Sequence, residues 1–183
     1  MQDIALEVDK EDKIINDLMM LVKLDKSAST PLNRESVDIE EMLEEILKSV
    51  HPIADQKGIE LILEIIRPVV CAVDKVKLSF AVTNIVENAI KYNIEKGWVR
   101  VSLDSEPSFF TIVIADSGIG IPEEEQTHIF ERFYRVDKSH STEIDGTGLG
   151  LAISRDAVLL HNGAIKVESE VGAGTVFTIK IPR

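Results

Sequence analysis

The sequence predicts an α+β domain with a mixed sheet covered by helices on one face, preceded by a separate N-terminal helix. Segments with helical periodicity and segments with strand character are interspersed without a regular repeat, and this order favours such a sheet. The chain has 183 residues, of which 44% are apolar, so its length suits one compact domain with a packed core and a modest appendage. Aromatic residues make up only 5%, which predicts a core of Ile, Val and Leu.

The first segment, from Ile4 to about Asp25, predicts an amphipathic helix. Its apolar residues recur at spacings of three, four and seven, the period of a helix with one apolar face. This apolar stripe consists of Val8, Ile15, Leu18, Met19 and Val22, with Leu21 and Leu24 beside it. The stripe has no obvious partner within the chain, so we expect it to pack on another helix. Polar residues and a proline then indicate a linker at residues 28–35, which separates a helix at 1–27 from a domain at 36–183.

The remaining elements follow from periodicity and from helix start and stop residues. Asp38 is the predicted N-cap of the first helix of the domain, and Gly58 ends that helix. Asn162 and Gly163 provide a left-handed stop for the last helix. The predicted helices are 39–56, 75–92 and 149–161, and the predicted strands are 36–37, 60–66, 69–73, 98–103, 109–115, 164–168 and 176–181.

The net charge of −12 argues against two classes of partner. An acidic surface repels nucleic-acid backbones and anionic membranes, so we expect no contact with either. The single cysteine, Cys71, lies in an apolar run and is interpreted as a buried strand residue. The sequence shows no signal peptide and no membrane-spanning stretch. We therefore expect a cytoplasmic domain, whether or not its full-length protein is anchored in the cell membrane.

One helix carries a polar stripe beside its apolar one. At about 100° per residue, Asn84, Asn88 and Lys91 fall on the same side of the helix 75–92. Amide oxygens are hard ligands and an ammonium is a point charge, so this stripe could hold a metal ion and the phosphates it bridges. Tyr92 lies between the two stripes, where its ring could approach a base or sugar. The alternative is a polar face that only contacts water.

A carboxylate and two glycines follow the apolar run that ends at Ala115. Asp116, Gly118 and Gly120 make either a simple turn or a ligand site, because glycines let the backbone approach a ligand closely. An ionised carboxylate only accepts hydrogen bonds, so Asp116 would suit the exocyclic amino group of adenine.

Three alternating glycines lead directly into the last helix. They lie within the run Gly146-Thr147-Gly148-Leu149-Gly150-Leu151. The free N–H groups at a helix N-terminus attract anions, so this turn is a candidate phosphate site. It is not a P-loop, which would need a Lys-Ser or Lys-Thr pair, and no strand runs into it as a dinucleotide fingerprint requires.

Residues 121–145 have no strong strand character, and loops of this length in compact domains are usually functional lids. The segment contains an aromatic helical turn that could dock on the domain, formed by Ile129, Phe130, Phe133 and Tyr134. Arg132, Arg135 and Lys138 are candidate phosphate contacts. The alternative is an exposed loop of mixed charge.

Together and in this order, these segments resemble the catalytic and ATP-binding domain of bacterial sensor histidine kinases, in the superfamily of gyrase and the heat-shock chaperones. Residues 84–92 resemble the N box of that family and residues 116–120 its G1 box. Residues 130–135 resemble the F box, 146–151 the G2 box and 172–175 the glycine motif of the closing hairpin. The resemblance implies a two-layer sandwich with a mostly antiparallel sheet, the Bergerat-type ATP-binding fold.

The resemblance also implies roles for these residues, with ATP and Mg²⁺ as cofactors. Asn88, with Asn84 beside it, would hold Mg²⁺ against the phosphates, and Lys91 and Arg135 would contact phosphate oxygens. Asp116 would accept from the adenine amino group. The implied nucleotide site further includes Tyr92, Gly118, Gly120, Ile121, Tyr134, Gly146, Thr147, Gly148, Leu149, Gly150, Leu151 and Thr175.

The N-terminal helix is similar to the second helix of the family's dimerisation and phosphotransfer domain, which pairs in a four-helix bundle of two chains. The family's phosphate acceptor is a His followed by an acidic residue, on the preceding helix. His51, His128, His140 and His161 do not match this pattern. We therefore expect that the acceptor lies outside this chain and that the chain does not phosphorylate itself. The implied partners are that dimerisation domain, in a homodimer, and the receiver domain of a response regulator.

Two other functions remain open alongside histidine kinase activity. One is an ATP-hydrolysing machine of the gyrase type, but those relatives place a Glu water-activating base where this chain has Asn84. Glu87 lies about 60° away from the polar stripe on a helical wheel. The other is a module that senses a nucleotide without transferring its phosphate.

Overall fold

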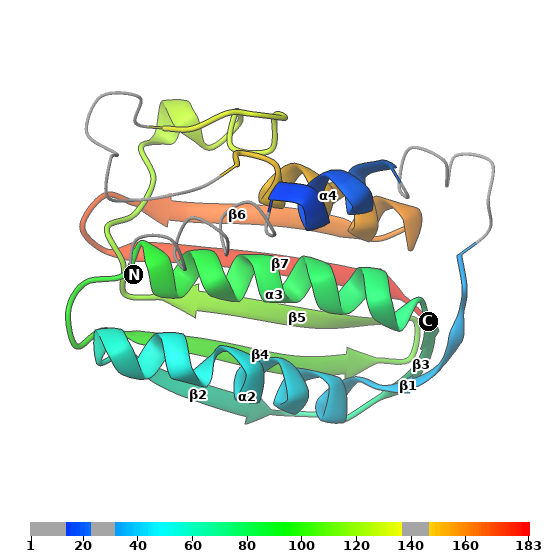
Figure 1. The fold of residues 1–183 in the computed structure, drawn as a ribbon. Coiled ribbons are helices and arrows are strands. Elements are labelled where there is room, and N and C mark those ends of the chain that lie inside the picture. The colour runs from blue at the N-terminus through cyan, green and yellow to red at the C-terminus, as the bar shows by residue number, and fades with distance from the viewer. Residues whose placement is uncertain (1–13, 23–31, 137–146) are drawn as a thin grey trace, which may run out of the picture.

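The computed structural model describes residues 14–22, 32–136 and 147–183. It confirms the predicted α+β class: a five-stranded sheet carries three helices on one face (Figure 1). The helices are α2 (Ile39–Lys57), α3 (Lys75–Lys91) and α4 (Gly150–Leu160), with a 3-10 turn at Glu123–Glu125. The strands are β1 (Glu35–Asp38), β2 (Glu60–Ile65), β3 (Val70–Val73), β4 (Trp98–Glu106), β5 (Phe109–Asp116), β6 (Ala164–Glu170) and β7 (Gly174–Pro182).

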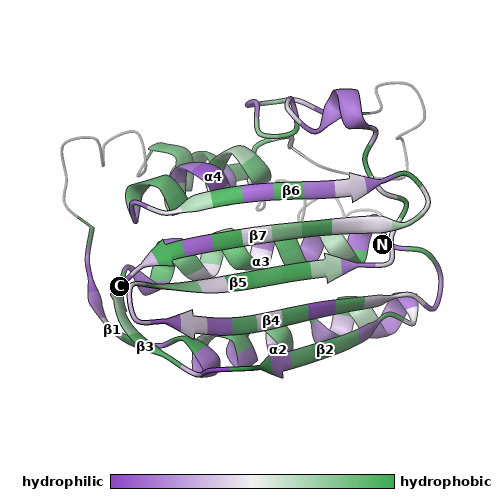
Figure 2. Ribbon diagram, turned by 180° about the vertical axis from the view of Figure 1, so that it is seen from behind, coloured by the Kyte–Doolittle hydropathy of each residue, from purple (hydrophilic) through white to green (hydrophobic). Residues whose placement is uncertain are grey.

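The strands of the main sheet are arranged in the order β2-β4-β5-β7-β6. Only β2 and β4 are parallel, whereas the other neighbouring pairs are antiparallel. Strands β1 and β3 form a separate antiparallel pair. Seen from behind, the sheet lies in front of the helices, so no helix of the described residues covers its second face (Figure 2). The strand β7, last in the sequence, therefore lies inside the sheet between β5 and β6.

Local sequence explains where the helices begin and end. The Asp38 carboxylate accepts the backbone N–H groups of Glu40 and Glu41, at 3.0 and 3.3 Å, and caps α2 as predicted. Gly58 ends α2 at φ 64°, a left-handed conformation that glycine adopts without steric cost. The Asp74 carboxylate caps α3 by accepting the N–H of Lys77 at 3.1 Å.

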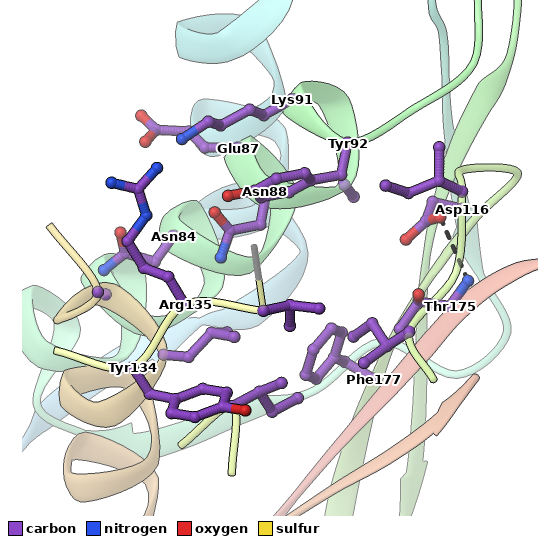
Figure 3. Close-up of a pocket in the computed structure, with 18 of the residues that line it drawn as sticks. Asn84, Glu87, Asn88, Lys91, Tyr92, Asp116, Tyr134, Arg135, Thr175 and Phe177 are labelled. Atoms are coloured by element: carbon purple, nitrogen blue, oxygen red, sulfur yellow. Dashed lines mark hydrogen bonds between the residues drawn. The ribbon is translucent and has the colours of Figure 1, made fainter. Parts of the chain in front are cut away.

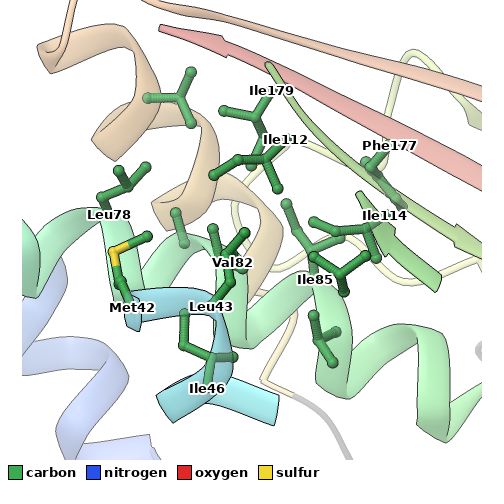
Figure 4. Close-up of a cluster of buried hydrophobic side chains, with 14 of the residues drawn as sticks. Met42, Leu43, Ile46, Leu78, Val82, Ile85, Ile112, Ile114, Phe177 and Ile179 are labelled. Atoms are coloured by element: carbon green, nitrogen blue, oxygen red, sulfur yellow. The ribbon is translucent and has the colours of Figure 1, made fainter. Parts of the chain in front are cut away.

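The core lies between the helices and the sheet and consists almost entirely of aliphatic side chains (Figure 4). Helix α3 occupies the middle of the helical layer, between α2 and α4 (Figure 1). Its Leu78, Val82 and Ile85 are fully buried and face Ile112 and Ile114 of β5. Burial of each such side chain stabilises the fold by about 1.5–3 kcal/mol, so the register of α3 is strongly fixed.

The fixed register of α3 sets the position of its polar stripe. Because the apolar residues face the sheet, Asn84 and Asn88 are held at one end of the helical layer, beside the end of β5 and the start of α4. The other predicted elements are present with shifted ends, since β4 and β5 continue to Glu106 and Asp116.

The described part of the N-terminal segment, residues 14–22, is helical. Two of its residues outside the predicted stripe contact the domain: Met20 is buried against the core and Asp17 is only 3% exposed. Ile15, Leu18 and Val22 of the predicted stripe are all exposed, while Val8 lies outside the described residues. Within the described ranges, no helix is both long and apolar enough to cross a bilayer.

Candidate functional site

A cavity of about 300 Å³ lies where α3, the ends of β5 and β7, and the start of α4 meet (Figure 3). Its walls include most of the residues predicted for a nucleotide site. These are Asn84, Asn88, Lys91, Tyr92, Asp116, Gly120, Ile121, Tyr134, Arg135, Thr147, Gly148, Gly150, Leu151 and Thr175. Segments that are far apart in the sequence thus contribute to one pocket.

The polar stripe of α3 forms one wall of the cavity. In Figure 3, Asn88 points into the pocket, and the guanidinium of Arg135 lies near the ends of Lys91 and Glu87. Asn84 is 8% exposed, and its Nδ2 is a buried side-chain atom without a hydrogen-bond partner among the described residues. An unsatisfied buried amide is costly, so this position calls for a polar ligand.

The glycine at the start of α4 makes room for this amide. A Cβ atom at Gly150 would lie 2.9 Å from Asn84 Oδ1, so a larger residue there would press on the side chain. The assignment of O and N in an asparagine amide follows from its hydrogen bonds. With the amide turned over, the unpartnered atom would be its oxygen, and amide oxygens such as those of Asn84 and Asn88 are ligands that Mg²⁺ accepts.

At the other end of the cavity lies Asp116, the last residue of β5. Its Oδ1 accepts the backbone N–H groups of Gly118, at 2.8 Å, and of Thr175, at 3.2 Å. Burial raises the pKa of this carboxyl above its ordinary value, although both N–H groups act in the opposite direction. The second carboxylate oxygen has no such bond within the described ranges and remains available as an acceptor.

The loop after β5 is fixed against the hairpin of β6 and β7. Gly120 has φ +75°, and a Cβ there would lie 2.1 Å from the carbonyl oxygen of Glu170. The carbonyl of Ile119 accepts the N–H of Gly172 at 2.8 Å, and the N–H of Ile121 donates to Ser169 Oγ at 2.8 Å. These contacts hold Ile121 in the cavity wall.

The glycine-rich turn before α4, predicted as a phosphate site, has a backbone fixed by local hydrogen bonds. Gly148 adopts φ +69°, and its carbonyl accepts the N–H of Phe133 at 2.9 Å. The N–H of Leu149 donates to Thr147 Oγ1 at 3.2 Å. Helix α4 begins at Gly150 without a side-chain cap, so its first N–H groups are available to an anion.

Some predicted residues do not line the cavity. Gly118 supplies only its N–H to Asp116, and the side chain of Leu149 is buried in the core. Arg132 pairs with Asp156 of α4 at 3.3 Å, so its prediction as a phosphate contact is not supported. Gly146, Lys138 and His140 lie outside the described residues.

Other residues in the pocket were not predicted. Asp17 of the N-terminal helical segment lines the cavity and accepts a hydrogen bond from Thr147 Oγ1 at 2.8 Å. Glu87 also lines it, beside Lys91 (Figure 3), although the helical wheel placed it away from the polar stripe. Phe177 of β7 forms part of the apolar floor. Only Phe177 had a signal in the sequence, as an aromatic residue on the closing strand.

Part of the predicted lid segment packs on the domain. Ile129 and Phe130 are buried, and the rings of Phe130 and Phe177 meet edge to face with centroids 6.2 Å apart. The hydroxyl of Tyr134 donates to the Glu125 carboxylate, and this bond raises the pKa of Tyr134 above its ordinary value. The N–H of Phe133 donates to the carbonyl of Gly148 at 2.9 Å, so these two residues lie side by side.

Comparison with known proteins identifies the family. Residues 73–183 match the model of the histidine kinase-, DNA gyrase B- and HSP90-like ATPases. The chain belongs to this family. It is 36% identical over 179 residues to the sensor histidine kinase WalK of Bacillus subtilis (strain 168), which covers 96% of the chain and 29% of WalK. The predicted class, a histidine kinase ATP-binding catalytic domain, is thereby confirmed.

Solved structures agree with this assignment. The mycobacterial sensor histidine kinase MprB has a TM-score of 0.71 and 34% identity, covering 81% of this chain and 97% of that one. Full-length ShkA, solved in complex with AMPPNP, has a TM-score of 0.81 and 29% identity, covering 93% of this chain and 35% of that one. The chain thus spans less than a third of WalK and about a third of ShkA.

Proposed function

We propose that this chain binds Mg-ATP in the cavity and transfers the γ-phosphoryl group to a histidine of a dimerisation helix. One observation carries the proposal: a single cavity holds an acceptor-only carboxylate at one end and amides, cations and a free helix N-terminus at the other. The carboxylate of Asp116 suits the adenine amino group, and the α4 N-terminus suits phosphates. The ATP analogue in the ShkA structure supports this choice of ligand.

Asn84 and Asn88 would hold Mg²⁺ through their amide oxygens. Among the described residues, no group of three or more His, Cys, Asp or Glu side chains could hold a metal ion, so the phosphates would supply further ligands. When bound, the ion would neutralise phosphate charge. Lys91 and Arg135 would contact phosphate oxygens, and Tyr92 would lie beside the nucleotide. Phosphoryl transfer of this kind depends mainly on positioning and charge neutralisation.

The remaining parts of the proposal concern the whole protein. Residues 1–27 would be the second helix of a dimerisation and phosphotransfer domain, 28–35 a linker and 36–183 the catalytic domain. We place this part in the cytoplasm, where ATP and a response regulator receiver domain are available. In the transfer, the bond from the γ-phosphorus to the β,γ-bridging oxygen breaks and a phosphorus–nitrogen bond to an imidazole forms, while ADP leaves with that oxygen.

A transfer experiment tests the proposal. Incubated alone with γ-labelled ATP and Mg²⁺, the chain should not label itself, because no His is followed by Asp or Glu. With a helical hairpin that carries such a histidine from its parent protein, it should produce an acid-labile, base-stable label on the hairpin. Self-labelling that is lost in His128→Ala or His140→Ala would overturn the proposed location of the acceptor.

ATP hydrolysis is the second candidate, because Glu87 lines the cavity. If Glu87 activates water, phosphate release should be fast without the hairpin and should fall strongly in Glu87→Gln. If the chain is a kinase, release without the hairpin should be slow in both proteins. A chain that binds ATP and shows neither reaction would be a nucleotide-sensing module.

A further inference from the structure

The hydroxyl group of Ser169 is a hydrogen-bond junction next to the Asp116 end of the cavity. Ser169 lies on β6 and does not line the cavity itself. Its Oγ receives the N–H of Ile121 at 2.8 Å, donates to the carbonyl of Gly174 at 2.9 Å, and lies 2.9 Å from Thr175 Oγ1. Ile121 and Thr175 are both part of the cavity wall.

The chemistry of the three partners fixes the proton positions. A serine hydroxyl has one proton to donate and two lone pairs to accept with. The N–H of Ile121 can only donate, and the carbonyl of Gly174 can only accept. Since the single proton of Ser169 goes to Gly174, the bond with Thr175 needs the proton of the Thr175 hydroxyl. In the opposite assignment, no proton would lie between Ser169 Oγ and the Gly174 oxygen.

The donation from Thr175 determines what the cavity presents to a ligand. With its proton turned toward Ser169, Thr175 Oγ1 keeps a lone pair for the cavity. Thr175 is the direct neighbour of Asp116 in the sheet, and the two lie side by side in Figure 3. The free oxygen of Asp116 is also an acceptor. The side chains at this end therefore offer two acceptors and no donor.

We infer that Ser169 is a positioning residue that sets adenine specificity through the hydroxyl of Thr175. This inference rests on the proposed binding of ATP. An exocyclic amino group has two N–H donors and satisfies two acceptors, whereas a carbonyl at the same ring position faces them with lone pairs. Without Ser169, the hydroxyl of Thr175 is free to rotate and donate into the cavity, where a carbonyl can accept it.

The position of Ser169 is itself held by a second side chain. Gln126 Nε2 donates to the carbonyl of Ser169 at 2.8 Å and to that of Ile121 at 3.0 Å. Ser169 and Ile121 are therefore connected twice, once through the Ser169 hydroxyl and once through the side chain of Gln126. Ser169→Ala removes only the hydroxyl connection, so the loop should keep its place and the substitution mainly releases the proton of Thr175.

The experiment compares ATP with ITP, which has a carbonyl in place of the 6-amino group. The dissociation constant of ITP divided by that of ATP is measured by calorimetry with Mg²⁺, and a larger ratio means a stronger preference for ATP. Ser169→Ala should lower the preference for ATP about tenfold, the effect of one mispaired hydrogen bond of about 1.4 kcal/mol. Ser169→Thr keeps a hydroxyl at this position and should keep the preference of the unmodified chain for ATP. Ser102→Ala, which removes a hydroxyl from the outer face of β4, should leave the ratio unchanged.

A double-mutant cycle shows whether Ser169 acts through Thr175. Thr175→Val should lower the ratio by itself, and Ser169→Ala should then add nothing. The ratio is measured within one preparation, so a reduced folded fraction cancels. If Ser169→Ala does not fold, Ser169→Cys, whose sulfur accepts the Thr175 proton only weakly, should give an intermediate ratio. An unchanged ratio, or an equal loss in the Thr175→Val background, would overturn the inference. If the unmodified chain binds neither nucleotide, the proposed function fails instead.

Discussion

Replacing Asp116 with Asn should separate stability from nucleotide affinity. The substitution keeps the side-chain shape and an Oδ1 that can accept the N–H groups of Gly118 and Thr175. It removes the charge, which burial disfavours, as the raised pKa of Asp116 indicates. At neutral pH the nucleotide-free variant should therefore unfold at a higher temperature than the unmodified chain.

The linkage between protonation and folding gives the magnitude and the sign. Each unit by which the folded pKa lies above the unfolded pKa corresponds to about 1.4 kcal/mol. For a domain of this size, each kcal/mol shifts the melting temperature by about 2–4 °C. Because the folded pKa of Asp116 is raised, its destabilising effect is complete above that pKa and disappears as the pH falls toward the ordinary value. The advantage of Asp116→Asn should therefore shrink in acid.

The affinity for ATP should change in the opposite direction. In Asp116→Asn an NH₂ group takes the place of the free carboxylate oxygen, so the charged acceptor for the amino group of ATP is lost. A hydrogen bond to a charged group contributes about 1.5–3 kcal/mol. The dissociation constant should rise about 10- to 150-fold. Melting curves from pH 4 to pH 8 and calorimetry at pH 7.5 measure the two effects.

Asp104 provides a control with the opposite sign. Its hydrogen-bonded pair with Arg67 holds the pKa of Asp104 below its ordinary value. Asp104→Asn should therefore lower the melting temperature at neutral pH and leave it unchanged in strong acid. ATP affinity should not change. If Asp116→Asn binds ATP as tightly as the unmodified chain, or melts at a lower temperature at neutral pH, the reasoning about this carboxylate is wrong.

Three further predictions concern other parts of the domain. Asn88→Ala should weaken binding of Mg-ATP tenfold or more, about 1.4 kcal/mol, and should weaken binding of ATP without Mg²⁺ much less. An equal loss of affinity with and without Mg²⁺ would show that Asn88 is not part of the metal site. Gly120→Ala should cost more than about 1 kcal/mol in urea unfolding and weaken ATP binding, because its Cβ would meet the Glu170 carbonyl at a positive φ; unchanged stability would contradict this close approach. Asp38→Ala should lower the free energy of unfolding by about 1 kcal/mol through loss of the α2 cap while ATP affinity stays constant, and altered affinity would show that the cap matters to the site.

Periodicity was enough to predict the helices, the strands and the polar side chains that α3 contributes to the cavity, whereas residues such as Ile121 and Thr175 were predicted from the family resemblance. The apolar stripe of α3 fixes its orientation, and the positions of Asn84 and Asn88 follow from that orientation alone. Asp116 could be predicted for a similar reason, since it ends an apolar strand that had to lie inside the sheet. Each of these residues owes its position to an element with a strong local pattern.

The missed residues owe their positions to contacts between distant segments. Asp17 meets Thr147 across 130 positions of sequence, and no periodic pattern encodes such a contact. Ser169 is an ordinary polar residue of an edge strand until the loop at Ile121 is placed against it. Glu87 shows a different limit, because a long side chain can reach a cavity from a position that a helical wheel assigns to another face.

The position of β7 has a consequence for protein synthesis. A ribosome adds β7 after every other labelled element, yet β7 lies between β5 and β6 and supplies Thr175 and Phe177 to the cavity. Until residues 174–182 have emerged, one edge of β5 has no strand beside it, and such an edge is prone to pair with other chains. A nascent chain at that stage also lacks Thr175 and Phe177 of the cavity wall. We therefore expect nucleotide to stabilise the chain fully only after β7 has been inserted between β5 and β6.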